Sequence, residues 1–278
     1  MIKDSETNFV YIADSLANKY PVFSKRFKKV LETAKLKFDF LPHTKDVWAV
    51  DYMPIQRGVN DFIQFIYCPD YLKGAAGTST ISDVTTICNL IGMSPTTSKI
   101  VLDGGNVIRS SNTIIMCDKV FRENPRVKPL KLISRLYEIF EVDKIVFIPT
   151  HPYDFTGHSD GMVRFLDDNT VLINDYSKEK KDFKLGLHLA LHNANLDWIE
   201  IPYNPYFNKS YYHVHGEYIN YLQVGQNIIV PTFKMKEDNV VVKKFESLFP
   251  RSNIYTINSN EIANDGGLLN CITWNIKL

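Results

Sequence analysis

The chain has 278 residues, with 45% hydrophobic and 23% charged types, which is typical of a folded globular protein and excludes a disordered one. Its 32 Lys and Arg residues nearly balance 31 Asp and Glu residues, so the formal net charge is +1 and no basic excess favours nucleic acid or an anionic membrane as main partner. No apolar run reaches the roughly 18 residues of a transmembrane helix, and the polar start from Met1 to Asn8 lacks the apolar centre of a signal peptide. We therefore expect a cytoplasmic location.

Five similar units follow one another along the chain. Each begins with an apolar run that predicts a buried strand, continues with apolar residues at helical spacing, and closes with a second apolar run. The opening strands start near residues 9, 63, 113, 170 and 227, a period of about 50–57 residues, and the second unit is the weakest match. The helices are expected over residues 24–34, 82–90, 130–140, 183–193 and 240–249. The closing strands are expected over residues 38–42, 99–102, 145–149, 198–202 and 254–257.

A strand–helix–strand unit cannot bury its own apolar face, so the five units must pack against one another. Five units can close into a ring, as propeller blades do, with one loop of each unit at the central axis. An open, doubly wound sheet has the same alternation of strands and helices and stays an alternative on periodicity alone. No linker or change of composition divides the chain, so we expect residues 1–278 to form one domain.

A polar segment follows each unit, and these segments contain the residues that are able to do chemistry. They cover residues 46–54, 103–106, 157–165, 215–221 and 265–274. In a closed ring all five would meet in one axial pocket, although they are far apart in the sequence. Each segment alone is a weak signal, because Asp-Gly-Gly-Asn is usually a turn and a single Cys is usually a small buried residue.

The polar segments bring together a cysteine, a histidine and two aspartates, namely Cys271, His158, Asp51 and Asp160. The four cysteines of the chain are far apart and form no Cys-x-x-Cys pair, so a free thiol is expected. This set permits covalent catalysis on a planar cation such as a guanidinium, which carboxylates bind bidentately. The guanidinium carbon is a poor electrophile, so a thiolate nucleophile is favoured, and the histidine can protonate the departing amine and then activate water.

Four short motifs lie in these segments: Trp48–Pro54, Asp103–Asn106, Gly157–Asp160 and Gly266–Thr273. In this order they resemble the Trp-x-Arg-Asp-x-x-Pro, acidic-Gly-Gly-Asn/Ser, Gly-His-x-Asp and Gly-Gly…Cys-Ile-Thr motifs of the bacterial peptidylarginine deiminase/agmatine deiminase family. That family is part of the pentein superfamily of guanidino-group-modifying enzymes. The resemblance extends from about residue 9 to residue 276.

The resemblance implies a five-bladed α/β propeller with ββαβ-type repeats around a central active site. It implies hydrolysis of the guanidino group of agmatine, arginine or peptidyl arginine to a ureido group and ammonia, through a covalent thiouronium on Cys271 and without a metal or other cofactor. His158 would then be the general acid/base, and Asp51 and Asp160 would hold the guanidinium. The implied substrate-binding residues are Trp48, Asp103, Gly105, Asn106, Arg164 and Asn270. The implied partner is a small-molecule or peptidyl guanidine, and no oligomer is predicted.

Two positions depart from the family pattern. Val50 stands where the family usually has Arg, and Asn270 stands where the agmatine enzymes commonly have His. The chain is also shorter than typical agmatine deiminases. Two alternatives therefore stay open: amidino transfer, in which an amine instead of water resolves the intermediate, and a guanidine-binding protein that has lost turnover.

A metal hydrolase is a third alternative from the residues themselves. His188 and His192 are four residues apart on a predicted helix, and His213 and His215 form a His-x-His pair. Two histidines at this helical spacing can bind zinc, but the segment between them lacks the Glu of the metalloprotease motif. A helix face and a loop are the simpler interpretation.

Overall fold

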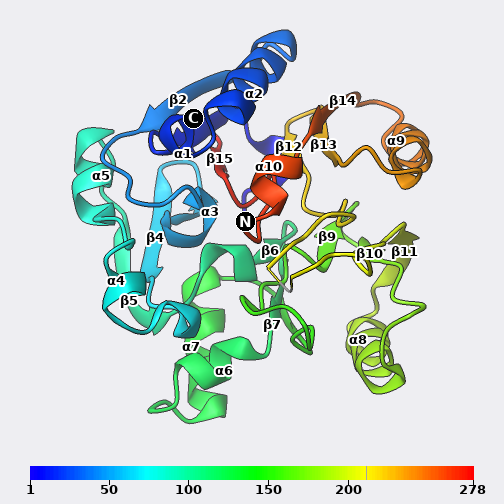
Figure 1. The fold of residues 1–278 in the computed structure, drawn as a ribbon. Helices are drawn as coiled ribbons and strands as arrows, with labels where there is room; N and C mark the ends of the chain where they lie inside the picture. The colour runs from blue at the N-terminus through cyan, green and yellow to red at the C-terminus, as the bar shows by residue number, and fades with distance from the viewer. Residues whose placement is uncertain (211) are drawn as a thin grey trace.

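The computed structural model describes residues 1–210 and 212–278, in which five small sheets are arranged like blades around a common axis (Figure 1). In each sheet the middle strand pairs antiparallel with one neighbour and parallel with the other, and a crossover helix joins the parallel pair. The five-bladed α/β propeller expected from the repeat and from the resemblance is confirmed, and the open doubly wound sheet is wrong.

The blades follow the order of the chain. The first contains β15 (Thr273–Ile276), β1 (Phe9–Ala13) and β2 (Lys37–Leu41), and the second contains β3 (Ile55–Gly58), β4 (Asp61–Ile66) and β5 (Thr96–Val101). The third contains β6 (Ile108–Arg109), β7 (Thr113–Cys117) and β8 (Lys144–Ile148). The fourth contains β9 (Val163–Phe165), β10 (Thr170–Asn174) and β11 (Asp197–Ile201), and the fifth contains β12 (Leu222–Val224), β13 (Asn227–Thr232) and β14 (Asn253–Asn258).

The crossover helices lie on the outer side of the ring (Figure 1). They are α2 (Pro21–Thr33), α5 (Val84–Leu90), α7 (Pro129–Phe140), α8 (Lys181–Asn193) and α9 (Glu237–Leu248). Short helices in the connections are α1 (Leu16–Lys19), α3 (Ala49–Tyr52), α4 (Ala75–Thr78), α6 (Lys119–Glu123) and α10 (Asn260–Ala263), and 3₁₀ turns span Asp4–Glu6, Asp70–Leu72 and Gly104–Asn106. No helix in residues 1–210 and 212–278 combines the length and apolar character that crossing a bilayer requires.

The predicted helices differ from the observed ones mainly at their first turns. The helix expected from residue 24 begins at Pro21, because proline is well tolerated at the first helical position, where no backbone donor is needed. The helix expected from residue 240 begins at Glu237, whose charge and that of Asp238 favour a helix N-terminus. In the second unit the closing strand begins at Thr96, and its pairing with β4 shifts register, which explains the weak sequence signal.

The ring is closed by the two ends of the chain. The C-terminal β15 pairs antiparallel with the N-terminal β1, with Phe9 opposite Ile276 and Ile12 opposite Thr273. Because Cys271 lies two residues before β15, this pairing carries it to the centre of the ring.

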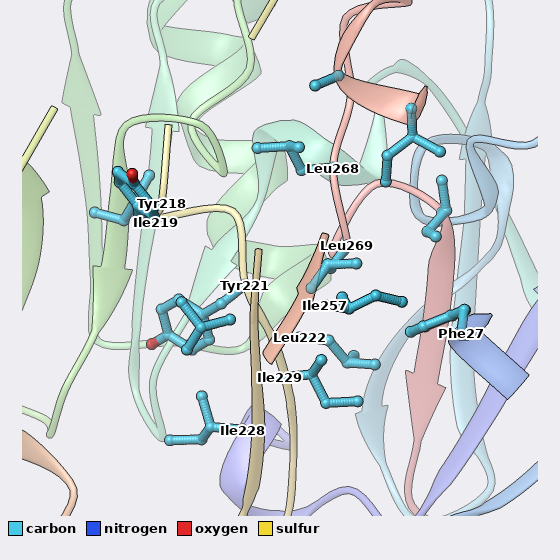
Figure 2. Close-up of a cluster of buried hydrophobic side chains, with 14 of the residues drawn as sticks. Phe27, Tyr218, Ile219, Tyr221, Leu222, Ile228, Ile229, Ile257, Leu268 and Leu269 are labelled. Carbon is cyan, nitrogen blue, oxygen red and sulfur yellow. The ribbon is translucent and has the colours of Figure 1, made fainter. Parts of the chain in front are cut away.

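A large apolar cluster fills the space between α2 and the fifth blade (Figure 2). Phe27 of α2 and Ile229 of β13 belong to it, and each is almost fully buried. Leu268 and Leu269, which directly precede the residues at the ring centre, lie in the same cluster with exposures of 1% and 0%. Full burial of one such side chain stabilises the fold by roughly 1.5–3 kcal/mol. This apolar packing therefore anchors the segment that presents Cys271.

Candidate active site

The connections between the blades meet at a cavity of about 800 Å³. Trp48 and Asp51 come from the connection between β2 and β3, and His158 and Asp160 come from the one between β8 and β9. Asn220 precedes β12, and Cys271 precedes β15; all of these residues line the cavity. The structure thus places the thiol, the imidazole and the two carboxylates selected from the sequence in the lining of one cavity.

Cys271 is held by Asn220. The side-chain Nδ2 of Asn220 lies 3.2 Å from Sγ, and its Oδ1 accepts from the backbone N–H groups of Asn270 at 3.0 Å and Cys271 at 3.4 Å. The thiol also points at Asp160, with 3.6 Å between Sγ and Oδ2. Burial, together with the charges of Asp160 and Asp51, raises the pKa of Cys271 well above its ordinary value. These surroundings favour the neutral thiol over the thiolate.

His158 lies between two carboxylates. Its Nδ1 is 3.4 Å from Oδ1 of Asp51, and its Nε2 is 2.9 Å from Oδ2 of Asp103. Burial alone would lower the pKa of His158. The charge of Asp51, and the hydrogen bond to Asp103 with its charge, outweigh this effect and raise the pKa to about 9. Burial raises the pKa of Asp51 to about 7, although the charge of His158 opposes this shift. The imidazole is therefore held in its protonated form at neutral pH.

A buried lysine stands behind this histidine. Nζ of Lys119 is 2.7 Å from Oδ2 of Asp103 and 3.2 Å from Oε1 of Glu123, and it lies 4.8 Å from the ring centre of Tyr71. Burial would raise the pKa of Asp103, but the hydrogen bond from His158 and the charges of His158 and Lys119 lower it. Asp103 is thus a buried anion with two cationic partners on one oxygen, as a buried charge requires.

Gly105 contacts the side chain of Asp51 and the backbone of Asp160 through its own backbone. Its N–H donates to Oδ1 of Asp51 at 3.1 Å, and its carbonyl accepts from the N–H of Asp160 at 3.0 Å. A Cβ at this position would lie only 2.7 Å from Nδ1 of His158 and would also strike Asp51. The close approach therefore requires glycine here.

Three further residues chosen from the sequence occupy different places. Trp48 lines the cavity, and its ring packs so closely on Gly267 that a side chain there would collide with it. Asn270 orients Asp160, because its Nδ2 donates to Oδ2 at 2.8 Å. Asn106 turns away from the cavity and braces β7, exchanging hydrogen bonds with the backbone of Cys117 at 2.7 and 3.3 Å.

Arg164 is not one of the described residues that line the cavity. It lies in β9, where its Nη1 donates to the carbonyl of Tyr221 at 2.9 Å and its Nη2 pairs with Asp4. The guanidinium also lies 4.5 Å from the ring centre of Tyr221. Its contacts tie the fourth and fifth blades to the N-terminal turn, so the structure does not bring it to the other candidates.

Val50, which replaces the family Arg, contacts the site through its backbone. Its N–H donates to the carbonyl of Cys271 at 3.3 Å, and its own carbonyl approaches Gly104 too closely to leave space for a Cβ there. A different residue, Lys119, pairs with Asp103 of the Gly-Gly segment.

Sequence reasoning did not select Asn220, Lys119, Tyr71 or Glu217. Asn220 and Glu217 lie in the polar segment 215–221, which the sequence analysis recognised. Their place in the repeat, equivalent to that of the other candidate residues, is the signal that could have identified them. Lys119 has no such signal, because it belongs to a short helix outside the five segments.

Of the histidines of the zinc alternative, His213 lines the cavity, whereas the cavity lining does not include His188, His192 or His215. The ring of His188 stacks on Trp198 with 4.7 Å between centres, and His213 and His215 face each other edge to face. Within residues 1–210 and 212–278, no group of three or more His, Cys, Asp or Glu side chains has the arrangement of metal ligands. The zinc alternative therefore has no ligand set in the described part of the chain.

Comparisons with known proteins agree with the fold and indicate the family. The family model of Porphyromonas-type peptidyl-arginine deiminase matches residues 1–276. The agmatine deiminase of Pseudomonas aeruginosa (strain UCBPP-PA14) is 22% identical over 210 residues, which cover 64% of this chain and 57% of the relative. This chain thus spans less than two thirds of the length of such curated relatives.

Solved structures of agmatine deiminase from C. jejuni have the same fold over nearly the whole chain. One has a TM-score of 0.80 at 16% identity and covers 99% of this chain and 94% of its own. Another, with substrate bound, has a TM-score of 0.78 at 18% identity and covers 99% of this chain and 95% of its own.

Proposed function

We propose, since this chain belongs to the Porphyromonas-type peptidyl-arginine deiminase family, that it hydrolyses the guanidino group of an arginine-like substrate to a ureido group and ammonia. The observation that carries the proposal is the position of Cys271, His158, Asp51 and Asp160 in the lining of a single cavity. Relatives named agmatine deiminase, one of them solved with its substrate bound, support a small guanidine as the substrate.

The two carboxylates beside the thiol would bind the guanidinium. Asp51 and Asp160 both act on Cys271 electrostatically, and Asp160 contacts its sulfur directly. A cation bound between them neutralises the charges that disfavour the thiolate. Because a nearby positive charge lowers the pKa of a thiol, substrate binding makes the thiol release its proton to solvent, and the substrate itself activates the nucleophile.

The first half of the reaction forms a covalent intermediate. The thiolate of Cys271 attacks the guanidinium carbon and gives a tetrahedral adduct. His158 donates its proton to one amino group, the C–N bond breaks, and ammonia leaves a thiouronium on the sulfur. The elevated pKa of His158 suits it to begin as the acid.

The second half consumes one water molecule. His158, now neutral, takes a proton from the water, whose oxygen attacks the thiouronium carbon. The C–S bond breaks, the sulfur of Cys271 recovers its electron pair and takes the hydroxyl proton of the adduct, which restores the thiol, and the neutral ureido product is released. Asp103 and Lys119 hold the imidazole in place through both halves.

A product screen tests the proposal. Purified protein is incubated with agmatine, arginine and an arginyl peptide, and both ammonia and ureido product are measured. We expect the two products in equal amounts from at least one guanidine, with activity abolished in Cys271→Ala and retained in Cys68→Ala, which removes an exposed free thiol. Folded protein that releases no ureido product from any guanidine would contradict the proposal, and guanidine binding without turnover would favour the binding-protein alternative.

A further inference from the structure

Tyr71 is an aromatic residue of the cavity lining that contacts both cations of a buried ion-pair group. We use the name ion-pair group for Glu123, Lys119, Asp103 and His158, which are linked in this order. The ring of Tyr71 meets the imidazole of His158 edge to face, with 6.0 Å between ring centres, and Nζ of Lys119 lies 4.8 Å from the centre of the same ring. Tyr71 and His158 line the cavity, whereas Lys119 and Asp103 are fully buried and do not. The ring therefore lies where the ion-pair group borders the cavity.

The chain around Tyr71 is fixed to the same group. Tyr71 lies in a 3₁₀ turn in the connection between β4 and α5. The N–H of Asp70 donates to Oε1 of Glu123 at 3.4 Å, and the same oxygen pairs with Lys119 at 3.2 Å. Phe155, from the connection between β8 and β9, packs edge to face on Tyr71 with 5.5 Å between ring centres. Contacts from two other connections thus set the position of the ring.

The ion-pair group depends on the exclusion of water. His158 and Lys119 share Oδ2 of Asp103, at 2.9 and 2.7 Å, so two cations are held by one oxygen. Their attraction to this oxygen is strong only while the local dielectric is low, because water and salt screen exposed charges. The face of an aromatic ring attracts a cation and occupies space that water would otherwise fill. A ring beside both cations therefore keeps the contact between Asp103 and His158 strong.

This contact determines which nitrogen of His158 is able to give up a proton. Nε2 is bound to Asp103, so Nδ1 is left for the reaction, and it lies 3.4 Å from Oδ1 of Asp51, which is proposed to hold the guanidinium. A general acid must lie within hydrogen-bond reach of the group that it protonates. A rotation of the imidazole away from Asp103 would therefore misplace Nδ1.

We propose that Tyr71 is a positioning residue for the reaction, whose ring covers the ion-pair group and keeps His158 on Asp103 with Nδ1 free to protonate the leaving amino group. The inference rests on the proposed function for the use of this proton, whereas the cover of the ion-pair group does not depend on it. The ring acts, and not the hydroxyl. Burial, together with the charge of Tyr67, raises the pKa of Tyr71 well above its ordinary value, so the phenol stays protonated and is neither acid nor base in the reaction.

Two variants of Tyr71 separate the ring from the hydroxyl, with agmatine as substrate. Tyr71→Phe keeps the ring and should keep kcat within about threefold. Tyr71→Leu removes it and should lower kcat roughly 10- to 100-fold, with KM changed less than about threefold, because a misplaced acid slows the chemical step more than it weakens binding. Tyr255→Leu removes a half-buried tyrosine of β14 outside the cavity lining and is the matched control, which should keep both constants.

The titration of His158 is a second measurement, and it needs no turnover. NMR of protein with isotope-labelled histidine follows the protonation of the imidazole, and the signal is assigned by its loss in His158→Gln. The charged groups around His158 in the described part of the chain are Asp51 of α3, Asp103, Lys119 and Glu123 of α6, and Asp154 and Asp160 of its own connection.

Tyr71→Leu should lower the midpoint of this titration. Water that enters in place of the ring weakens the attraction of Asp51 and Asp103, and it also relieves the burial that opposes protonation. The carboxylates outweigh burial in the intact site, so the pKa should fall from about 9 by about one unit, toward the ordinary value of about 6.5. Tyr71→Phe and Tyr255→Leu should keep the midpoint of unmodified protein.

An unchanged midpoint in folded Tyr71→Leu would overturn the inference, and so would an unchanged kcat. A loss in Tyr71→Phe as large as that in Tyr71→Leu would also overturn it, as would a rise in KM alone, because the hydroxyl or direct substrate binding would then be the role of Tyr71. If Tyr71→Leu does not fold, Tyr71→Met, with a flexible apolar chain, takes its place under the same criteria. If no guanidine is turned over, the proposed function fails separately, and the titration alone decides whether Tyr71 covers the ion-pair group.

Discussion

The side chain of Asn220 contacts Cys271 at two points, with Nδ2 3.2 Å from Sγ and Oδ1 3.4 Å from the backbone nitrogen. Asn220 thus fixes the position of the sulfur and donates a hydrogen bond that favours the thiolate over the thiol. It comes from the connection before β12, while Cys271 comes from the one before β15, so the contact joins two blades.

Replacing Asn220 should therefore slow the reaction of the thiol. A hydrogen bond to a charged group is worth about 1.5–3 kcal/mol, so we expect Asn220→Ala to lower kcat/KM by roughly 10- to 100-fold. The same variant should be alkylated more slowly at Cys271, measured by mass spectrometry at neutral pH. Asn112→Ala removes an exposed amide that pairs with Asp143 and is the control. An unchanged alkylation rate in Asn220→Ala would show that the contact does not affect the sulfur.

A methyl group on Gly105 should disrupt the site without disrupting the fold elsewhere. The new Cβ would lie 2.7 Å from Nδ1 of His158, so the imidazole must move. A displacement of about 1 Å can reduce a rate on the order of 100-fold, and we expect a loss of this size in Gly105→Ala. The control is Gly58→Ala, whose Cβ would make an ordinary 3.7 Å contact with Asp61. Similar activity of the two variants would contradict the close packing at Gly105.

Removing the cation of Lys119 should destabilise the protein. Lys119→Met leaves Asp103 and Glu123 as buried carboxylates without their shared partner, and breaking a buried pair in this way costs about 3–5 kcal/mol. Urea denaturation measures the change in the free energy of unfolding. Lys236→Met removes an exposed lysine and should change it by less than about 0.5 kcal/mol. Comparable effects of the two substitutions would be evidence against a buried ion-pair network.

The titration of His158 should appear in the pH dependence of stability. Its pKa is about 9 in the folded chain and about 6.5 in an unfolded one, so the folded state binds the extra proton between these values. The stabilisation is complete below about pH 6.5 and is lost as the pH rises through about 9. Asp51, whose pKa is raised to about 7, also binds an extra proton in the folded state. Its contribution to stability is therefore lost in the same direction, as the pH rises through about 7.

Urea denaturation at pH 6 and pH 9 tests this sign. The free energy of unfolding should fall between the two values, and the fall should be smaller in His158→Gln, which cannot take up the proton. His192→Gln, on the exposed face of α8, should behave like unmodified protein. Equal pH dependence in unmodified protein and His158→Gln would rule out the raised pKa.

The strands, the helices and the five-fold repeat follow from the sequence by itself. Apolar spacing is a local property, and in α7 it places Leu132, Leu136 and Phe140 on one buried face. The repeat also indicates which segments face the axis, so Cys271 and His158 could be chosen as candidates before any coordinates were known.

Only the tertiary structure determines how each side chain in those segments is directed. Asn106 and Arg164 stand in recognised polar segments, yet Asn106 braces β7 and Arg164, in β9, pairs with Asp4, so neither is among the residues that line the cavity. Lys119, from outside every motif, reaches Asp103 because α6 directly follows β7, and Asn106 of the Gly-Gly segment is bonded to the backbone of Cys117 at the end of that strand. Spacing along the chain predicts which face a residue occupies within one element. The contacts between connections depend on how five separate blades close around one axis, which no local pattern encodes.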